Sequence, residues 1–181
     1  MNYNLIQPAA DLSPFIKHYW VMESSLGCNE KHIQRIVPAG FAELLFYYGD
    51  IPKALNNINY AYSPSMLNGQ LNKYYDLMVT GNLSVFSVIF HPHGAKEIFG
   101  LPMHEAFNKS ISLVDLMGQK GCDVQNQMIE ASSTDKRIEI IESFFRKQLS
   151  GIDFYQQKRF SSSIDLVNKC NGAVTLDMLA D

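Results

Sequence analysis

Residues 35–48 read RIVPAGFAELLFYY, and this stretch does most to decide the fold. In an extended strand, side chains 41–48 alternate between two faces, and both faces are largely apolar. A strand with two apolar faces has to be covered on both sides. The Pro-Ala-Gly step at 38–40 favours a turn, so we expect a hairpin that joins 35–37 to 41–48.

Short apolar runs, punctuated by glycine, proline and asparagine, fill the chain up to about residue 90. The further strands that we expect are 15–23, 32–37, 74–80 and 84–90, with weaker candidates between 60 and 71. Gly81 and Asn82 lie between two of these runs and indicate a second hairpin. Several short strands in series favour a small barrel or sandwich.

The pattern becomes helical after Gly94. We expect helices over 95–99, 114–130 and 135–149, the second of them broken or kinked around Gly118 and Gly121. Ser133 or Thr134 can cap the last helix. Its apolar stripe consists of Ile138, Ile141, Phe145 and Leu149, widened by Ile140 and Phe144. The stripe can pack on its own domain, and its breadth also suits a dimer interface.

The composition describes a globular chain of one domain, or one domain with a fragment. Of its 181 residues 46% are hydrophobic and 18% are charged, and the formal net charge is −3. A self-sufficient DNA-binding domain usually carries a basic face, which this charge does not require. The three cysteines are widely spaced, and we see neither a signal peptide nor a membrane span, so we expect a cytoplasmic protein with free thiols.

The order of these patterns suggests three parts. We expect a first domain over 1–150, with strands to about 92 and helices over about 93–150, then a linker over 151–160. In 161–181 a helix ends at Asn171 and Gly172, and Thr175 can cap a second helix.

Several short motifs carry a resemblance to a known family. In chain order they are LSPFI at 12–16, YW at 19–20, RIVPAGFAELLF at 35–46, YGD at 48–50, LNGQ at 67–70, FHPHG at 90–94, GLP at 100–102 and LVDL at 113–116. Together they resemble the N-terminal domain of one branch of the AraC/XylS-type bacterial transcription regulators. Residues 161–181 are similar to the start of the helix-turn-helix domain of that family, with Leu179 and Ala180 as the Leu-Ala pair of its second helix.

The resemblance implies an α+β fold, with a small cupin-like β-barrel, a helical subdomain and an incomplete helix-turn-helix segment at the C-terminus. It implies a ligand-sensing or dimerisation domain that is not an enzyme and has no catalytic residue or cofactor. The partners would be a small-molecule effector and a second copy of the chain. DNA would be bound only through the missing C-terminal domain, and no membrane is involved.

Glu43 is the polar exception in the apolar strand, and a carboxylate there has to be paired or hydrated. Arg35 lies across the expected turn, so we favour a structural ion pair with Arg35 over a ligand contact. In the functional alternative both residues line the mouth of the barrel. Trp20, Tyr47 and Phe90 complete the candidate ligand-binding set, although such aromatic residues more often form the core.

His91, His93 and Glu97 have a spacing that resembles the metal motif of catalytic cupins, which makes a metal-dependent enzyme one alternative. Pro92 interrupts the strand, and the run that contains Glu97 is expected to be helical, so the three side chains need not converge. We therefore expect no metal, and a strand-to-helix turn with both histidines at the surface. An interaction module without a ligand is the third possibility.

Overall fold

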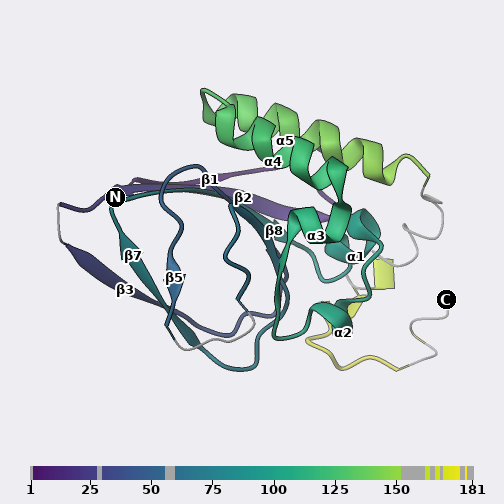
Figure 1. The fold of residues 1–181 in the computed structure, drawn as a ribbon. Coiled ribbons are helices and arrows are strands. Elements are labelled where there is room, and N and C mark those ends of the chain that lie inside the picture. The colour runs from purple at the N-terminus through teal and green to yellow at the C-terminus, as the bar shows by residue number, and fades with distance from the viewer. Residues whose placement is uncertain are drawn as a thin grey trace. The chain divides into compact units, whose positions relative to one another are not determined.

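The computed structural model describes residues 2–27, 30–55, 60–151, 162–163, 166–167, 169–175 and 178. The chain divides into two compact units, Met1–Gln148 and Leu149–Asp181, and each is described by itself. The first unit contains two antiparallel sheets and five helices (Figure 1). The expected α+β class is confirmed at this level.

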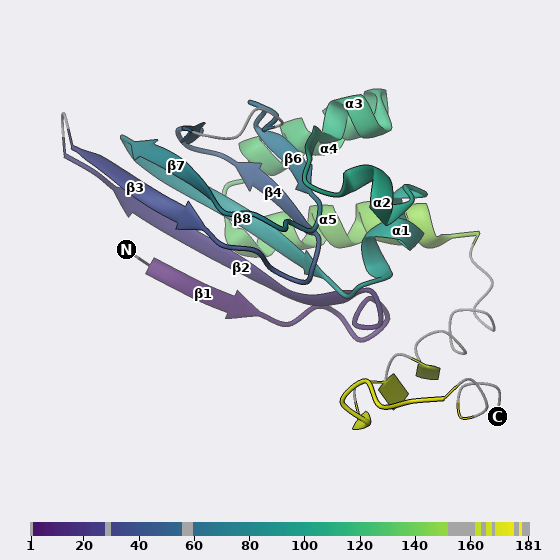
Figure 2. The same cartoon turned by 90° about the horizontal axis from the view of Figure 1, so that it is seen from below.

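The larger sheet has six strands. In spatial order they are β1 (Asn2–Ile6), β2 (Ile16–Ser25), β8 (Asn82–Phe90), β4 (Glu43–Tyr47), β6 (Ser65–Asn68) and β9 (Ser110–Ser112). Every neighbouring pair is antiparallel. Figure 2 shows β1, β2, β8, β4 and β6 side by side in this order.

The smaller sheet has three strands, β3 (Lys31–Ile36), β7 (Tyr75–Thr80) and β5 (Lys53–Ala54), in that spatial order. The helices are α1 (Gly94–Phe99), α2 (Met103–Ala106), α3 (Leu113–Met117), α4 (Gln119–Glu130) and α5 (Thr134–Leu149). In the described part of the chain the strand ladders form two open sheets, and no ladder closes them into a barrel.

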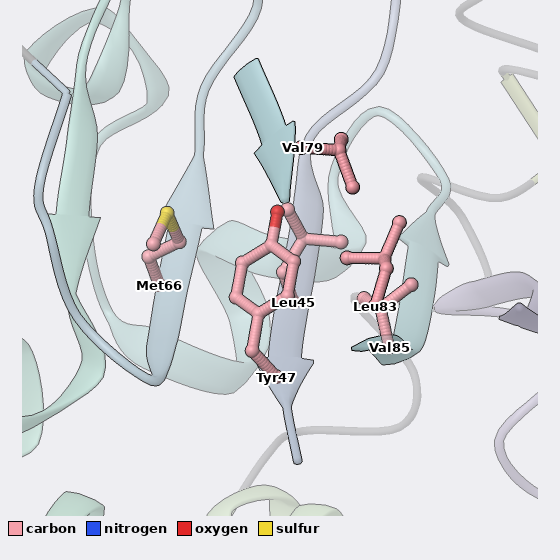
Figure 3. Close-up of a cluster of buried hydrophobic side chains, with 6 residues drawn as sticks. All are labelled: Leu45, Tyr47, Met66, Val79, Leu83 and Val85. Carbon is pink, nitrogen blue, oxygen red and sulfur yellow. The ribbon is translucent and has the colours of Figure 1, made fainter. Parts of the chain in front are cut away.

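The larger sheet is covered on both faces, so the expected two-sided cover of β4 is confirmed. One face packs against α4 and α5, and its fully buried side chains include Tyr19, Leu44, Phe46, Phe86 and Val88. The other face turns towards the smaller sheet. Figure 3 shows the apolar cluster there: Leu45 and Tyr47 from β4, Met66 from β6, Val79 from β7, and Leu83 and Val85 from β8.

Both predicted hairpins are wrong. β3 and β4 belong to different sheets, because β3 pairs with β7 while β4 lies between β6 and β8. β7 and β8 are likewise separated, although only Gly81 lies between them in the chain. Gly81 has a φ of 70°, and a Cβ there would stand 2.3 Å from the Asp50 carboxylate. Each turn therefore reverses the chain while carrying it from the smaller to the larger sheet.

The predicted helices are found after Gly94, but α2 and the strand β9 in the same part of the chain were not predicted. Gly118, with a φ of 58°, ends α3 and precedes α4, so the predicted break is confirmed. The Ser133 hydroxyl accepts a hydrogen bond from the Lys136 amide at 3.2 Å, which confirms the cap of α5. On α5 the side chains of Ile141 and Phe145 are completely buried, as the stripe predicted.

A buried carboxylate fastens α5 to the N-terminal part of the unit. Glu142 accepts hydrogen bonds from the Ala9 amide at 2.9 Å and from the Tyr19 hydroxyl at 3.3 Å. The Arg146 guanidinium lies 3.1 Å from its second oxygen and also holds Asp11 in a two-point contact. Each oxygen of this carboxylate is therefore satisfied.

Arg137 supports the end of α4 from within the protein. Its guanidinium donates to the carbonyls of Met128 at 3.0 Å and Ala131 at 2.7 Å, which lie at the C-terminal end of that helix. The same group stacks on the Tyr48 ring, with 3.7 Å to the centroid.

The second unit is described in part. Asn171 and Gly172 both have positive φ, and the Gly172 amide donates to the Val167 carbonyl at 2.8 Å, which agrees with the predicted helix end. The Met178 amide lies 3.4 Å from the Thr175 hydroxyl, which agrees with the predicted cap. The predicted linker beyond Gly151, together with Leu179 and Ala180, lies outside the described residues. Within the described part, no helix has the length and apolar character needed to cross a membrane.

Candidate functional site

Glu43, the first residue of β4, lies on the face of the larger sheet that turns towards the smaller sheet. Its Oε1 accepts a hydrogen bond from Trp20 Nε1 at 3.0 Å and another from Ser87 Oγ at 2.6 Å. The donors come from β2 and β8; β8 lies between β2 and β4 in the sheet. Strand order thus brings together three residues that are distant in the sequence.

The polar groups continue across the sheet as a row. Asn68 lies directly opposite Glu43 on β6, and Ser110 lies opposite Asn68 on β9, so all three side chains share one face. Ser110 Oγ donates to Asn68 Oδ1 at 2.6 Å. We name Ser87, Glu43, Asn68 and Ser110 the polar row. It borders the apolar cluster of Figure 3.

Tyrosine side chains lie near the polar row. The hydroxyls of Tyr47 and Tyr60 are 3.4 Å apart, and the rings of Tyr60 and Tyr75 have centroids 5.6 Å apart. Burial raises the pKa of Tyr60 to about 12, with the Glu43 carboxylate adding to the rise and the Tyr47 hydroxyl opposing it. Burial, followed by the neighbouring Tyr60, also raises the pKa values of Tyr47 and Tyr75, and Glu43 adds to both. All three tyrosines therefore stay neutral at physiological pH.

The Glu43 side chain is half-buried. Burial raises its pKa, and the hydrogen bonds from Ser87 and Trp20 offset only part of that rise. Its Oε2 receives no hydrogen bond from any residue that the structure describes. Glu43 also takes no part in the ion pairs of the described residues.

The predicted ion pair between Arg35 and Glu43 is wrong. Arg35 Nε and Nη2 donate to the two oxygens of Asp76 at 2.8 and 3.0 Å, and the guanidinium lies 4.1 Å from the centroid of the Tyr74 ring. Arg35 and Asp76 face each other across β3 and β7, on the face opposite to buried Tyr75. Arg35 therefore lies on the outer surface of the smaller sheet.

The remaining predicted ligand-binding residues are divided between the two faces of the larger sheet. Trp20 and Tyr47 lie on the Glu43 side, as the candidate set requires. Phe90 lies on the helix side, where its ring makes edge contacts with Phe99 and Phe145, with centroids 5.9 Å apart in each case. The structure thus brings Trp20, Glu43 and Tyr47 together and separates Arg35 and Phe90 from them.

The histidine motif forms the expected strand-to-helix turn, because α1 begins at Gly94. His93 is nevertheless buried beside the Phe15 ring, which corrects the surface position predicted for it. Burial, followed by the neighbouring His91, lowers the pKa of His93. Among the residues with a described position, no group of three or more histidine, cysteine, aspartate or glutamate side chains could hold a metal ion. Within those residues, His91, His93 and Glu97 therefore do not form the metal site that the metal-dependent enzyme alternative requires.

The edge of the smaller sheet shows where solvent reaches the space between the sheets. On β3, His32 and Gln34 lie opposite Val79 and Leu77, so these four side chains share the inward face. The β7 partners are buried, whereas His32 and Gln34 are exposed. The inward face of β3 is thus exposed to solvent at these two residues.

A concave surface lies between α4 and α5, with a volume of about 890 Å³. Val124, Ile140 and Phe144 form its apolar part. Its charged lining residues are Lys120, Asp123, Glu130, Lys136, Glu139 and Lys147. This α4–α5 groove coincides with the helix that was predicted to form a dimer interface.

Sequence reasoning missed most of the residues around Glu43. Ser87 is a lone hydroxyl in the apolar run 85–90, which was the one available signal. Asn68 and Ser110 carry no local signal, because their role depends on β4, β6 and β9 being neighbours. Tyr60 could be read only as general aromatic content.

The fold and the site define a two-sheet α+β domain with a polar row between its sheets. The chain belongs to the family of the domain of unknown function DUF6597, which matches residues 4–112. The matched region begins within β1 and runs to the end of β9, so it contains the smaller sheet, nearly all of the larger sheet and the whole polar row. No curated protein and no solved structure matches the chain.

Proposed function

We propose that this chain is the sensory part of an AraC/XylS-type transcription regulator and that a small-molecule effector binds between its two sheets. The ordered motifs between residues 12 and 116 support the family, and two facing antiparallel sheets are compatible with a cupin-like domain. Likeness of fold carries no chemistry by itself, so the functional argument rests on the site.

The observation that carries the proposal is the environment of Glu43. A carboxylate beside an apolar cluster costs free energy unless it is satisfied, yet only Oε1 has hydrogen-bond donors in the described part of the chain. A few placed polar groups within a mostly apolar, aromatic lining are typical of small-molecule sites. The solvent-exposed inward face of β3 gives such a molecule a route of entry.

The proposal assigns dimerisation to the α4–α5 groove. Its apolar residues, surrounded by charges of both signs, suit a self-complementary interface between two copies. We expect sedimentation at about tens of micromolar to show a dimer, a concentration chosen for a weak pair. Ile140→Glu should yield a monomer with an unchanged circular dichroism spectrum, and a monomeric wild type would contradict this assignment. DNA recognition is assigned to a helix-turn-helix domain of the kind that residues 161–181 resemble.

The effector proposal can be tested with the single tryptophan of the chain. Trp20 donates directly to Glu43, so its emission reports on the site. A metabolite library is screened by melting temperature, and the molecules that stabilise the chain are titrated against Trp20 emission. We expect at least one to saturate both signals and to bind Glu43→Gln more weakly. A screen without any such molecule, or binding unaffected by that substitution, would refute the effector site.

A further inference from the structure

The charge balance around Glu43 indicates which class of molecule fits the site. Two other carboxylates of low exposure, those of Glu142 and Asp76, each form an ion pair with an arginine. Glu43 has only the neutral donors Trp20 and Ser87. Its charge therefore has no compensating cation in the part of the protein that the structure describes.

The groups nearest to Glu43 supply no positive charge. Tyr47, Tyr60 and Tyr75 are neutral, and the other members of the polar row are amide or hydroxyl side chains. Burial lowers the stability of the ionised carboxylate, so a ligand that restores a favourable electrostatic environment gains the most from binding there.

Aromatic rings add to the same preference. The Trp20 indole donates a hydrogen bond to the carboxylate. The centroid of the Tyr3 ring lies 5.8 Å from the centroid of the Trp20 ring. Tyr60 and Tyr75 are paired on the smaller-sheet side of Tyr47. The face of an aromatic ring attracts cations, most strongly for tryptophan. A carboxylate among such rings favours a positively charged ligand and opposes an anion.

We propose that the site between the sheets binds a small apolar molecule that carries a protonated amine, with Glu43 as its counter-ion and the rings of Trp20, Tyr47 and Tyr60 around it. This inference rests on the proposed effector site and specifies the chemical class of its ligand. The apolar cluster beside the polar row would receive the hydrocarbon part, while Oε2 of Glu43 would accept from the ammonium group.

The test uses the full chain and two sets of probes, each with a cationic, a neutral and an anionic head group on the same type of hydrocarbon. The first set is 2-phenylethylamine, 2-phenylethanol and phenylacetate, and the second is the corresponding cyclohexyl series. Both amines are protonated at neutral pH, as a lysine side chain is. Binding is measured by Trp20 emission and by calorimetry. We expect each amine to bind at least about tenfold more tightly than its alcohol, from the ion pair and cation–π contacts, and the carboxylates not to saturate.

Two substitutions assign this preference to Glu43. Glu43→Gln keeps the size of the side chain and an acceptor for Trp20 and Ser87, and should remove the advantage of the amine while changing alcohol binding little. Glu23→Gln is the matched control, because Glu23 is an exposed glutamate on β2 that contacts the Tyr48 hydroxyl. It should retain the full preference. If Glu43→Gln does not fold, Trp20→Leu measured by calorimetry should weaken amine binding instead.

The outcomes separate this inference from the effector proposal. An alcohol or carboxylate that binds as tightly as its amine, or a preference that survives in Glu43→Gln, overturns the cation assignment and leaves an effector site in place. The same holds if none of the six probes binds but the metabolite screen finds a neutral or anionic ligand. If the probes and the screen both yield nothing, the cation assignment and the effector site fail together.

Discussion

The two faces of the larger sheet bury polar groups in opposite ways. On the helix side, Glu142 has hydrogen-bond donors for both oxygens, and Arg137 has two carbonyl acceptors and an aromatic ring. On the side of the smaller sheet, Glu43 has two neutral donors on one oxygen. The same sheet therefore carries a satisfied polar network on one face and, on the other, a carboxylate whose second oxygen has no donor among the described residues.

This difference indicates that the polar groups on the helix side stabilise the fold, whereas Glu43 on the other side serves the proposed ligand binding. A satisfied buried network stabilises one arrangement of the chain, because removing any member leaves its partners unpaired. An incompletely satisfied carboxylate costs stability, and such a cost is typical of positions where a ligand completes the site. Substitutions on the two faces should therefore change stability in opposite directions.

We expect the largest effect on stability from removing a large buried side chain on the helix side of the larger sheet. Phe145 is completely buried and contacts the rings of Phe90, Phe99 and Phe144. Phe145→Ala should lower the free energy of unfolding by about 3–5 kcal/mol in urea titrations. Phe107→Ala, at an exposed phenylalanine, is the control and should change it by less than about 0.5 kcal/mol. Equal effects at the two positions would mean that the helix side is not the core.

Removing one polar side chain from the network on the helix side should also lower the stability of the protein. Arg137→Met keeps much of the side-chain volume but leaves the Met128 and Ala131 carbonyls without their donor. We expect a loss of about 2–3 kcal/mol, since unsatisfied buried acceptors retain their desolvation penalty. The neighbouring exposed Lys136→Met should have little effect. A neutral Arg137→Met would contradict the view that this network supports the fold.

On the face that turns towards the smaller sheet, we expect a substitution of Glu43 to raise the free energy of unfolding. The folded pKa of Glu43 is raised, so its contribution to stability is fully present below the ordinary glutamate value of about 4.3 and is lost as pH rises through the folded pKa. Glu43→Gln should therefore match the wild type in acid and become the more stable protein towards neutral pH. The gain should be smaller than the two losses above. Urea titrations across this pH range would contradict the idea if the two proteins stayed parallel.

The smallest effect is expected at the outer end of the helix-side network. Asp11 and Arg146 form a two-point contact at the surface, and both side chains are about half exposed. Asp11→Asn should cost less than about 1 kcal/mol, because exposed ion pairs are screened by water and salt. The cost should shrink further in high salt. A salt-independent loss as large as that of Arg137→Met would place Asp11 within the supporting network.

The sequence by itself determined the features that local pattern records. Alternation in residues 41–48 predicted a strand covered on both sides, and helical periodicity predicted α5 and the buried position of Phe145. Glu43 stood out because a charge in an apolar run has a cost that can be recognised without knowing its neighbours. Burial is periodic along a strand or helix, so these features follow from the order of the residues alone.

Only the tertiary structure decided which strands became neighbours. The turns at 38–40 and at Gly81 were recognised, but they connect different sheets, because turn residues fix where the chain reverses and not which strand it then joins. Arg35 consequently faces Asp76 and not Glu43. Glu43 meets Trp20 and Ser87 because β2, β8 and β4 lie side by side, a pairing set by burial across the whole unit.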